Sequence, residues 1–274
     1  MQFLPKPLFQ QLWILCFTLV LSSTSHAIRG GQLVSDLSSE SPHQGRIGLI
    51  AELIVSIQKE PAAHRGTNHF QHKCSGLLIK SGLIITAAHC FDDKDFNIKV
   101  TSEAIEFLPK RIGLHKRYER QELYDDYWKF LYDIQLHNDY ALIEIEPISN
   151  ISALINYLTI HIQNQDTLEK SHALYVLGFG QTANIFGMGE GEGQLRITGP
   201  LSAQLRSKNR VEIKDNVRGA CQGDSGGPLI KFHQDNIELI GTVSQGDCNT
   251  FSRYQLITKN SLKKSNFRWF KSSP

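Results

Sequence analysis

The chain has 274 residues, of which 41% are hydrophobic and 20% charged, and its 29 Lys and Arg nearly balance 27 Asp and Glu. This is an ordinary globular composition, and the small, scattered net charge of +2 disfavours a nucleic-acid partner or an acidic membrane surface. Nine Pro and 21 Gly without a period exclude a collagen-like chain, so we expect one compact globular unit.

Residues 1–27 have the pattern of a secretory signal peptide. Lys6 is the only charged residue there, an apolar run covers residues 12–21, and Ser25-His26-Ala27 places small residues at the cleavage position. The run is about half of the ~20 residues that a membrane-spanning helix needs, which disfavours a stable membrane anchor. We expect cleavage before Ile28 and a secreted protein, extracellular or periplasmic.

Four cysteines remain after Cys16 is removed with this segment. They are Cys74, Cys90, Cys221 and Cys248. An even number in a chain bound for an oxidising compartment predicts two disulfides. Three pairings are possible, and the spacing favours Cys74–Cys90 and Cys221–Cys248, which each close a short loop. The sequence has no C-x-x-C and no H-E-x-x-H motif, so it implies neither a metal nor another cofactor.

Short β-branched or apolar runs recur along the mature chain, and helical periodicity is scarce. The runs cover residues 48–57, 77–79, 83–85, 141–145, 173–177, 239–243 and 254–257. Many short strands separated by turn residues predict an antiparallel all-β sandwich or barrel.

Four other segments carry weaker patterns. Residues 58–73, which contain His64, His69 and His72, and the glycine-glutamate run 187–193 are expected to be loops, with the histidines facing solvent. Residues 121–136 fit neither a strand nor a helix. Residues 266–271 are expected to belong to a short C-terminal helix with an apolar face.

Three short motifs carry the groups that nucleophilic acyl transfer requires. They are Thr86-Ala87-Ala88-His89-Cys90, Asn138-Asp139-Tyr140-Ala141-Leu142 and Gly223-Asp224-Ser225-Gly226-Gly227-Pro228. A serine hydroxyl is a poor nucleophile unless a base takes its proton, and a carboxylate must hold that base in the right tautomer. Ser225, His89 and Asp139 can fill these roles. The glycines beside Ser225 allow a sharp turn, so that backbone amides can point at a developing oxyanion.

In this order the motifs resemble those of the trypsin/chymotrypsin family of serine proteases. Four further strings are similar to family signatures: Ile28-Arg29-Gly30-Gly31 to Ile-Val-Gly-Gly, Cys74-Ser75-Gly76 to the strand before the histidine loop, Gly178-Phe179-Gly180 to Gly-Trp-Gly, and Val243-Ser244-Gln245-Gly246 to Val-Ser-Trp-Gly. The resemblance covers nearly the whole mature chain. It implies that residues 28–274 form one trypsin-like serine protease domain.

The family's fold is two six-stranded antiparallel β-barrels with the active site between them. The resemblance implies that His89 and Asp139 come from the first barrel and Ser225 from the second. It also implies an oxyanion hole made by the N–H groups of Gly223 and Ser225. Ser244 would support Asp139, and Gly246 would leave room for a substrate strand. The matching disulfides are Cys74–Cys90 and Cys221–Cys248.

The resemblance also bears on activation and specificity. A new ammonium at Ile28 would pair with Asp224 and order the oxyanion hole, so signal removal alone would activate the enzyme. Gly219 stands where trypsin-like members carry an acid at the base of the primary pocket, so cleavage after Lys or Arg is not supported. With Ala220 and Ser252 it implies a neutral pocket for a small, aliphatic or aromatic side chain.

These residues predict a secreted serine endopeptidase that cleaves protein or peptide substrates through an acyl-enzyme. The alternative is a non-catalytic binding module on a protease scaffold, but such proteins usually lack a triad member and this sequence keeps all three. An esterase of the α/β-hydrolase class would share the G-x-S-x-G pattern of Gly223–Gly227. The order His, Asp, Ser is wrong for that fold.

Overall fold

The structure of the chain is a computed structural model. It describes Ile28 and residues 31–37, 43–61, 66–67, 69–93, 97–102, 105–123, 133–148, 155–156, 158–160, 173–181, 193–233 and 236–272. For residues 121–123, 133–135 and 159–160 only the backbone is described. The signal peptide expected at residues 1–27, His64, and all of the expected loop at 187–193 except Gly193 lie outside these residues.

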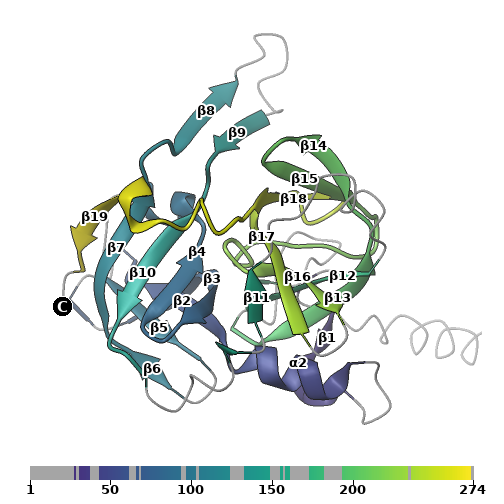
Figure 1. Ribbon diagram of the computed structural model, residues 1–274, viewed down its shortest axis with the longest axis horizontal. Helices are drawn as coiled ribbons and strands as arrows, with labels where there is room; N and C mark the ends of the chain where they lie inside the picture. The colour runs from purple at the N-terminus through teal and green to yellow at the C-terminus, as the bar shows by residue number, and fades with distance from the viewer. Residues whose placement is uncertain are drawn as a thin grey trace, which may run out of the picture.

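Two curled antiparallel sheets make up most of the described chain (Figure 1). The N-terminal sheet has eight strands in the order β19-β7-β10-β4-β3-β2-β5-β6. Because β5 returns to contact β7, the six strands from β7 to β5 along this order curl into a barrel, and β6 and β19 are additions. The bounds are β2 Ile54–Lys59, β3 Gln71–Lys80, β4 Leu83–Thr86, β5 Ile98–Thr101, β6 Glu106–Phe107, β7 Pro109–His115, β10 Ala141–Ile145 and β19 Phe267–Lys271.

The second sheet has nine strands. Eight follow the order β1-β13-β12-β16-β17-β18-β15-β14, and β11 pairs in parallel with β17. Six strands, from β13 to β15, form its main path, and the short strands β1, β14 and β11 are added to it. The bounds are β1 Gln32–Leu33, β11 Leu158–Ile160, β12 Leu174–Gly178, β13 Arg196–Leu201, β14 Gln204–Ser207, β15 Arg210–Lys214, β16 Pro228–His233, β17 Asn236–Gly246 and β18 Phe251–Leu256. The expected all-β, two-barrel architecture is confirmed.

The core joins the barrels into one body. The larger apolar cluster contains residues of the first barrel, such as Ile54 and Leu77, together with Ile230 and Leu239 of the second. A smaller cluster around Tyr254 fills the rest of the second barrel. Burial of this apolar area holds the barrels against each other, so groups on their facing edges keep their mutual positions.

The strand expected over residues 48–57 begins later than predicted. Residues Gln44–Ala51 form helix α2, and β2 starts only at Ile54. Ile47, Ile50 and Ala51 are buried, and their spacing of three and four residues places them on one face of a helix. The helix packs this face against the larger apolar cluster.

The expected C-terminal helix is wrong. Residues Phe267–Lys271 form strand β19, which pairs with β7, and only a single 3-10 turn, Lys264–Asn266, precedes it. Phe267 is buried and Arg268 exposed, which is the alternation of a strand with one covered face. Pairing with β7 satisfies the backbone groups of an edge that would otherwise be open.

The described ends of the unassigned segment 121–136 lie in two paired strands. Strands β8 (Glu119–Leu123) and β9 (Asp133–His137) pair with each other and project from the first barrel on the same side as β14 and β15 (Figure 1). Arg210 of β15 donates a hydrogen bond to the Leu136 carbonyl at 3.3 Å, which joins β9 to the second barrel. Within the described part of the chain no helix has the length and apolar character to span a membrane.

Candidate active site

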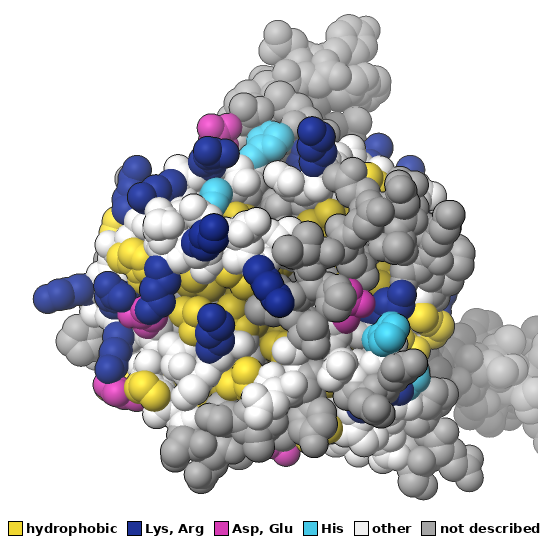
Figure 2. All heavy atoms as spheres, viewed as in Figure 1, with side chains coloured by type: hydrophobic (Ala, Val, Ile, Leu, Met, Phe, Trp, Pro, Cys, Tyr) yellow, Lys and Arg dark blue, Asp and Glu magenta, His cyan; other side chains and the backbone are white. Residues whose placement is uncertain are grey.

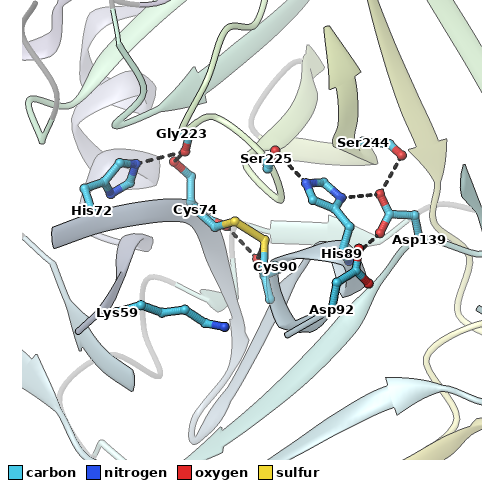
Figure 3. Close-up of a disulfide and its surroundings, with 12 residues drawn as sticks. Lys59, His72, Cys74, His89, Cys90, Asp92, Asp139, Gly223, Ser225 and Ser244 are labelled. Carbon is cyan, nitrogen blue, oxygen red and sulfur yellow. Dashed lines mark hydrogen bonds and ion pairs between the residues drawn. A yellow bond between two sulfur atoms is a disulfide. The ribbon is translucent and has the colours of Figure 1, made fainter. Parts of the chain in front are cut away.

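His89, Asp139 and Ser225 meet between the two barrels (Figure 3). His89 lies in the 3-10 turn Ala88–Phe91 directly after β4, Asp139 lies between β9 and β10, and Ser225 lies in the turn before β16. His89 Nε2 is 2.8 Å from Ser225 Oγ, and His89 Nδ1 is 2.8 Å from Asp139 Oδ2. This geometry lets the imidazole take the hydroxyl proton while a carboxylate accepts its other N–H.

The carboxylate of Asp139 is fully buried and each oxygen has partners. Oδ1 accepts the backbone N–H of His89 at 2.9 Å, and Oδ2 accepts both His89 Nδ1–H and the Ser244 hydroxyl, the latter at 2.6 Å. The preceding Asn138 has φ of 51°, a conformation that Asn tolerates well, and its side chain donates to the Arg117 carbonyl. These contacts hold both the position and the orientation of the imidazole.

The charge state of His89 is set by opposing effects. Burial lowers the pKa of the imidazole, but the charge and hydrogen bond of Asp139, with a smaller contribution from Asp92, outweigh it and raise the pKa above 6.5. Arg120 opposes the rise weakly. The imidazolium that forms when Ser225 loses its proton is therefore stabilised where it is made.

The Ser225 turn needs glycine on its C-terminal side. Gly226 has φ of 81°, and a Cβ there would collide with Thr86 Oγ1. The Thr86 hydroxyl donates to the Ser75 carbonyl, and Ser75 N–H donates to the Ser225 carbonyl at 2.8 Å. The nucleophile is thus held directly against β3 and β4, which carry the base.

Two peptide groups beside Ser225 have hydrogen-bonded carbonyls, which fixes the direction of their N–H groups. The Gln222 carbonyl accepts from Gln181 N at 2.7 Å, and the Asp224 carbonyl accepts from Gly227 N at 2.8 Å. Because a trans peptide directs its N–H opposite to its C=O, these bonds turn the N–H groups of Gly223 and Ser225 the other way. Neither N–H donates to another described residue.

His72 was expected to face solvent and instead takes part in this turn. Its Nε2 donates to the Gly223 carbonyl at 2.9 Å (Figure 3). The Ser56 hydroxyl lies 2.7 Å from its Nδ1. Ser75 Oγ donates to the same carbonyl at 2.9 Å and accepts from Phe179 N. Ser75 lies in the string Cys74-Ser75-Gly76, whereas no motif marked His72, whose only signal in the sequence is its position two residues before Cys74.

Asp224 is buried beneath the turn. Its carboxylate accepts the N–H groups of Gly180 and Cys221 at 2.9 and 2.8 Å, yet burial dominates and raises the pKa to about 7. Among the described residues no cationic side chain contacts it. Ile28 is also fully buried, although it follows the expected cleavage point directly. The ion pair between Asp224 and a free Ile28 ammonium remains a prediction.

The residues expected to shape the primary pocket come together. Ala220 N donates to Ser252 Oγ at 2.8 Å, and Ser252 pairs with Gly246 across β17 and β18. A Cβ on Gly246 would lie 2.8 Å from the Ala220 carbonyl, so this close approach requires glycine. Gly219 directly precedes Ala220 and has φ of 157°.

Both expected disulfides are present. Cys74–Cys90 joins β3 to the turn that carries His89, and Cys221–Cys248 joins the Ser225 segment to the turn after β17. Cys74, His89 and Cys90 have ligand-type atoms within 4.8 Å of one another. The two sulfurs are bonded to each other, so this group offers no thiolate to a metal.

Comparison with known proteins agrees with this geometry. The family model described as Trypsin matches residues 54–265, which is well over half of the chain. Chymotrypsin-C of Bos taurus is 24% identical over 220 residues, covering 70% of this chain and 75% of the relative. Trypsin zeta of Drosophila erecta is 25% identical over 284 residues, covering 90% and 93%. Vitamin K-dependent protein C of Mus musculus is 26% identical over 217 residues, covering 68% and 43%.

Proposed function

The chain belongs to the trypsin family of serine proteases, and we propose that it is a secreted endopeptidase that cleaves peptide bonds through an acyl-enzyme on Ser225. The observation that carries the proposal is the continuous hydrogen-bonded chain from Ser244 through Asp139 and His89 to Ser225. Each member has the chemistry and the distance that its role requires. The relatives named chymotrypsin and trypsin support the same reaction class.

The reaction begins when Ser225 Oγ attacks the scissile carbonyl carbon and His89 Nε2 takes the hydroxyl proton. The N–H groups of Gly223 and Ser225 donate hydrogen bonds to the oxyanion, and one such donor stabilises the transition state by roughly 3–4 kcal/mol. His89 then gives its proton to the leaving amine, and the C–N bond breaks to leave an ester on Ser225. Water, deprotonated by His89, attacks this ester and restores the hydroxyl.

The substrate is a protein or peptide in extended conformation. It would add as a strand beside Gly246 at the end of β17. The side chain before the cleaved bond would enter the space around Gly219, Ala220 and Ser252, which carry no charge. Two cations are adjacent to these residues in sequence, and both are paired: Arg218 with Asp215 at 2.9 Å, and Arg253 with Glu212 at 2.9 Å. A neutral side chain is therefore the preferred one.

Activation and catalysis are tested together by intact mass. We expect the secreted protein to begin at Ile28 and to gain the mass of one fluorophosphonate adduct, on Ser225. A chain that retains residues 1–27 should react at least about tenfold more slowly, because no ammonium reaches Asp224, and burial raises the pKa of its carboxyl to about 7. An Asp224→Asn variant should gain nothing from trimming, because its side chain cannot form the ion pair.

Two results would contradict the proposal in different ways. A natural N-terminus far from Ile28 would overturn direct maturation and leave the triad untouched. A folded chain that begins at Ile28 and takes no adduct would favour a binding module on a protease scaffold.

The rate should depend on pH through His89. Catalysis requires the neutral imidazole, so kcat/KM on a peptide amide should fall as the pH drops through the raised pKa, with a midpoint above 6.5. An Asp92→Asn variant should move this midpoint to lower pH, because Asp92 is one of the charges that raise the pKa. A profile that is flat between about pH 5 and 8 would show that His89 is not the base.

A further inference from the structure

A second hollow, remote from the triad, has a volume of about 590 Å³. Its walls come from the end of β3, the start of β4, the segment around β11 and the segment after β18. The lining residues are Ile79, Lys80, Leu83, Ile155, Leu158, Lys259, Leu262, Lys263 and Lys264. Ser75, which contacts Ser225, and Lys80 lie five residues apart on β3, which is about 16 Å of strand. The hollow is therefore separate from the active site.

The floor of this pocket is apolar and belongs to the core. Ile79 and Leu83 are buried members of the larger apolar cluster, and Ile155, Leu158 and Leu262 pack against that cluster while remaining partly exposed. Such a floor is formed before any ligand arrives. The volume lies within the range of about 300–1,000 Å³ that small-molecule sites occupy.

The rim of the pocket is cationic. Lys264 forms an ion pair with Glu144, which also binds Arg111 at 2.6 Å. Lys80, Lys259 and Lys263 are exposed, and none has an acidic partner among the described residues. Figure 2 shows apolar side chains at the surface between Lys and Arg side chains, left of centre on the face seen there.

We propose that this pocket binds a fatty acid with an alkyl chain of about twelve carbons, with the alkyl chain on the apolar floor and the carboxylate at Lys80, Lys259 and Lys263. A neutral hydrocarbon would leave the cationic rim unused, and a small inorganic anion would leave the floor in contact with water. An amphipathic monoanion satisfies both parts. The lysine stems can pack along the alkyl chain while their ammonium groups meet the carboxylate in water.

Titration calorimetry with dodecanoate, below its micelle concentration, tests the proposal on the mature chain. We expect saturable binding of one molecule, binding of 1-dodecanol weaker by about tenfold or more, and no heat from butyrate. Equal binding of the alcohol would overturn the role of the lysine rim. Absence of saturable dodecanoate binding would overturn the site itself.

Charge variants distinguish the effect of the rim lysines on binding from the effect of the protein's net charge. The variant Lys80→Gln, Lys259→Gln, Lys263→Gln keeps most of each stem and should bind dodecanoate about tenfold more weakly. The matched control Lys116→Gln, Lys208→Gln, Lys271→Gln removes three exposed cations elsewhere and should bind within about twofold of the parent. Equal affinities for the two variants would contradict the proposal. Because the readout is binding, the outcome is independent of protease activity.

Discussion

Replacing Ser225 with alanine is expected to lower kcat for peptide amide hydrolysis by about 10⁶-fold. The change removes the oxygen that forms the acyl-enzyme, and no other hydroxyl lies within hydrogen-bonding distance of His89 Nε2 among the described residues. The fold should survive, because Ser225 is held by its backbone carbonyl, which accepts from Ser75 N, and this bond does not involve the side chain.

The measurement is the initial rate on a peptide amide, with circular dichroism and the thermal midpoint as fold controls. Ser207→Ala is the matched control, because Ser207 is an exposed β14 residue whose hydroxyl, among the described residues, accepts only the N–H of Asn209. It should keep full activity. Persistent peptidase activity in the Ser225→Ala protein would refute the proposed nucleophile.

Replacing Asp139 with asparagine is expected to lower kcat by about 10⁴-fold. The side chain keeps its size, but an amide has one acceptor oxygen where a carboxylate has two. In the native protein Oδ1 accepts the backbone N–H of His89, and Oδ2 accepts His89 Nδ1–H and the Ser244 hydroxyl. Asparagine cannot satisfy all three donors, so His89 is released from the tautomer that leaves Nε2 free to accept. The charge that stabilises the imidazolium is lost as well.

The pH profile distinguishes this loss from a simple packing defect. Because Asp139 is the main group that raises the pKa of His89, the acid limb of kcat/KM should move to lower pH in the Asp139→Asn protein. The control Asp92→Asn should show a smaller shift and keep most of kcat, because Asp92 contacts Tyr118 and Arg120 and has no hydrogen bond to the imidazole. An unchanged acid limb in Asp139→Asn would argue against the proposed role.

Local sequence was sufficient to predict a feature wherever one short segment contains both the reactive groups and the residues that set its backbone conformation. The string Gly223-Asp224-Ser225-Gly226-Gly227-Pro228 specifies a tight turn, because Gly226 must have a positive φ and approach Thr86 closely. The apolar runs at β3, β4, β10, β12 and β17 predicted strands, and those strands are present. The cysteine spacing favoured the two disulfides that the structure contains.

Tertiary contacts decided the features whose local pattern was ambiguous. Residues 267–271 alternate too briefly to distinguish a helix from a strand, and the open edge of β7 selected the strand. Residues 44–51 became a helix because its apolar face meets the core. The roles of His72 and Ser75, and the lysine-rimmed pocket, depend on segments far apart in sequence. Periodicity describes only which face of a segment is buried, and it contains no information about which distant segment covers that face.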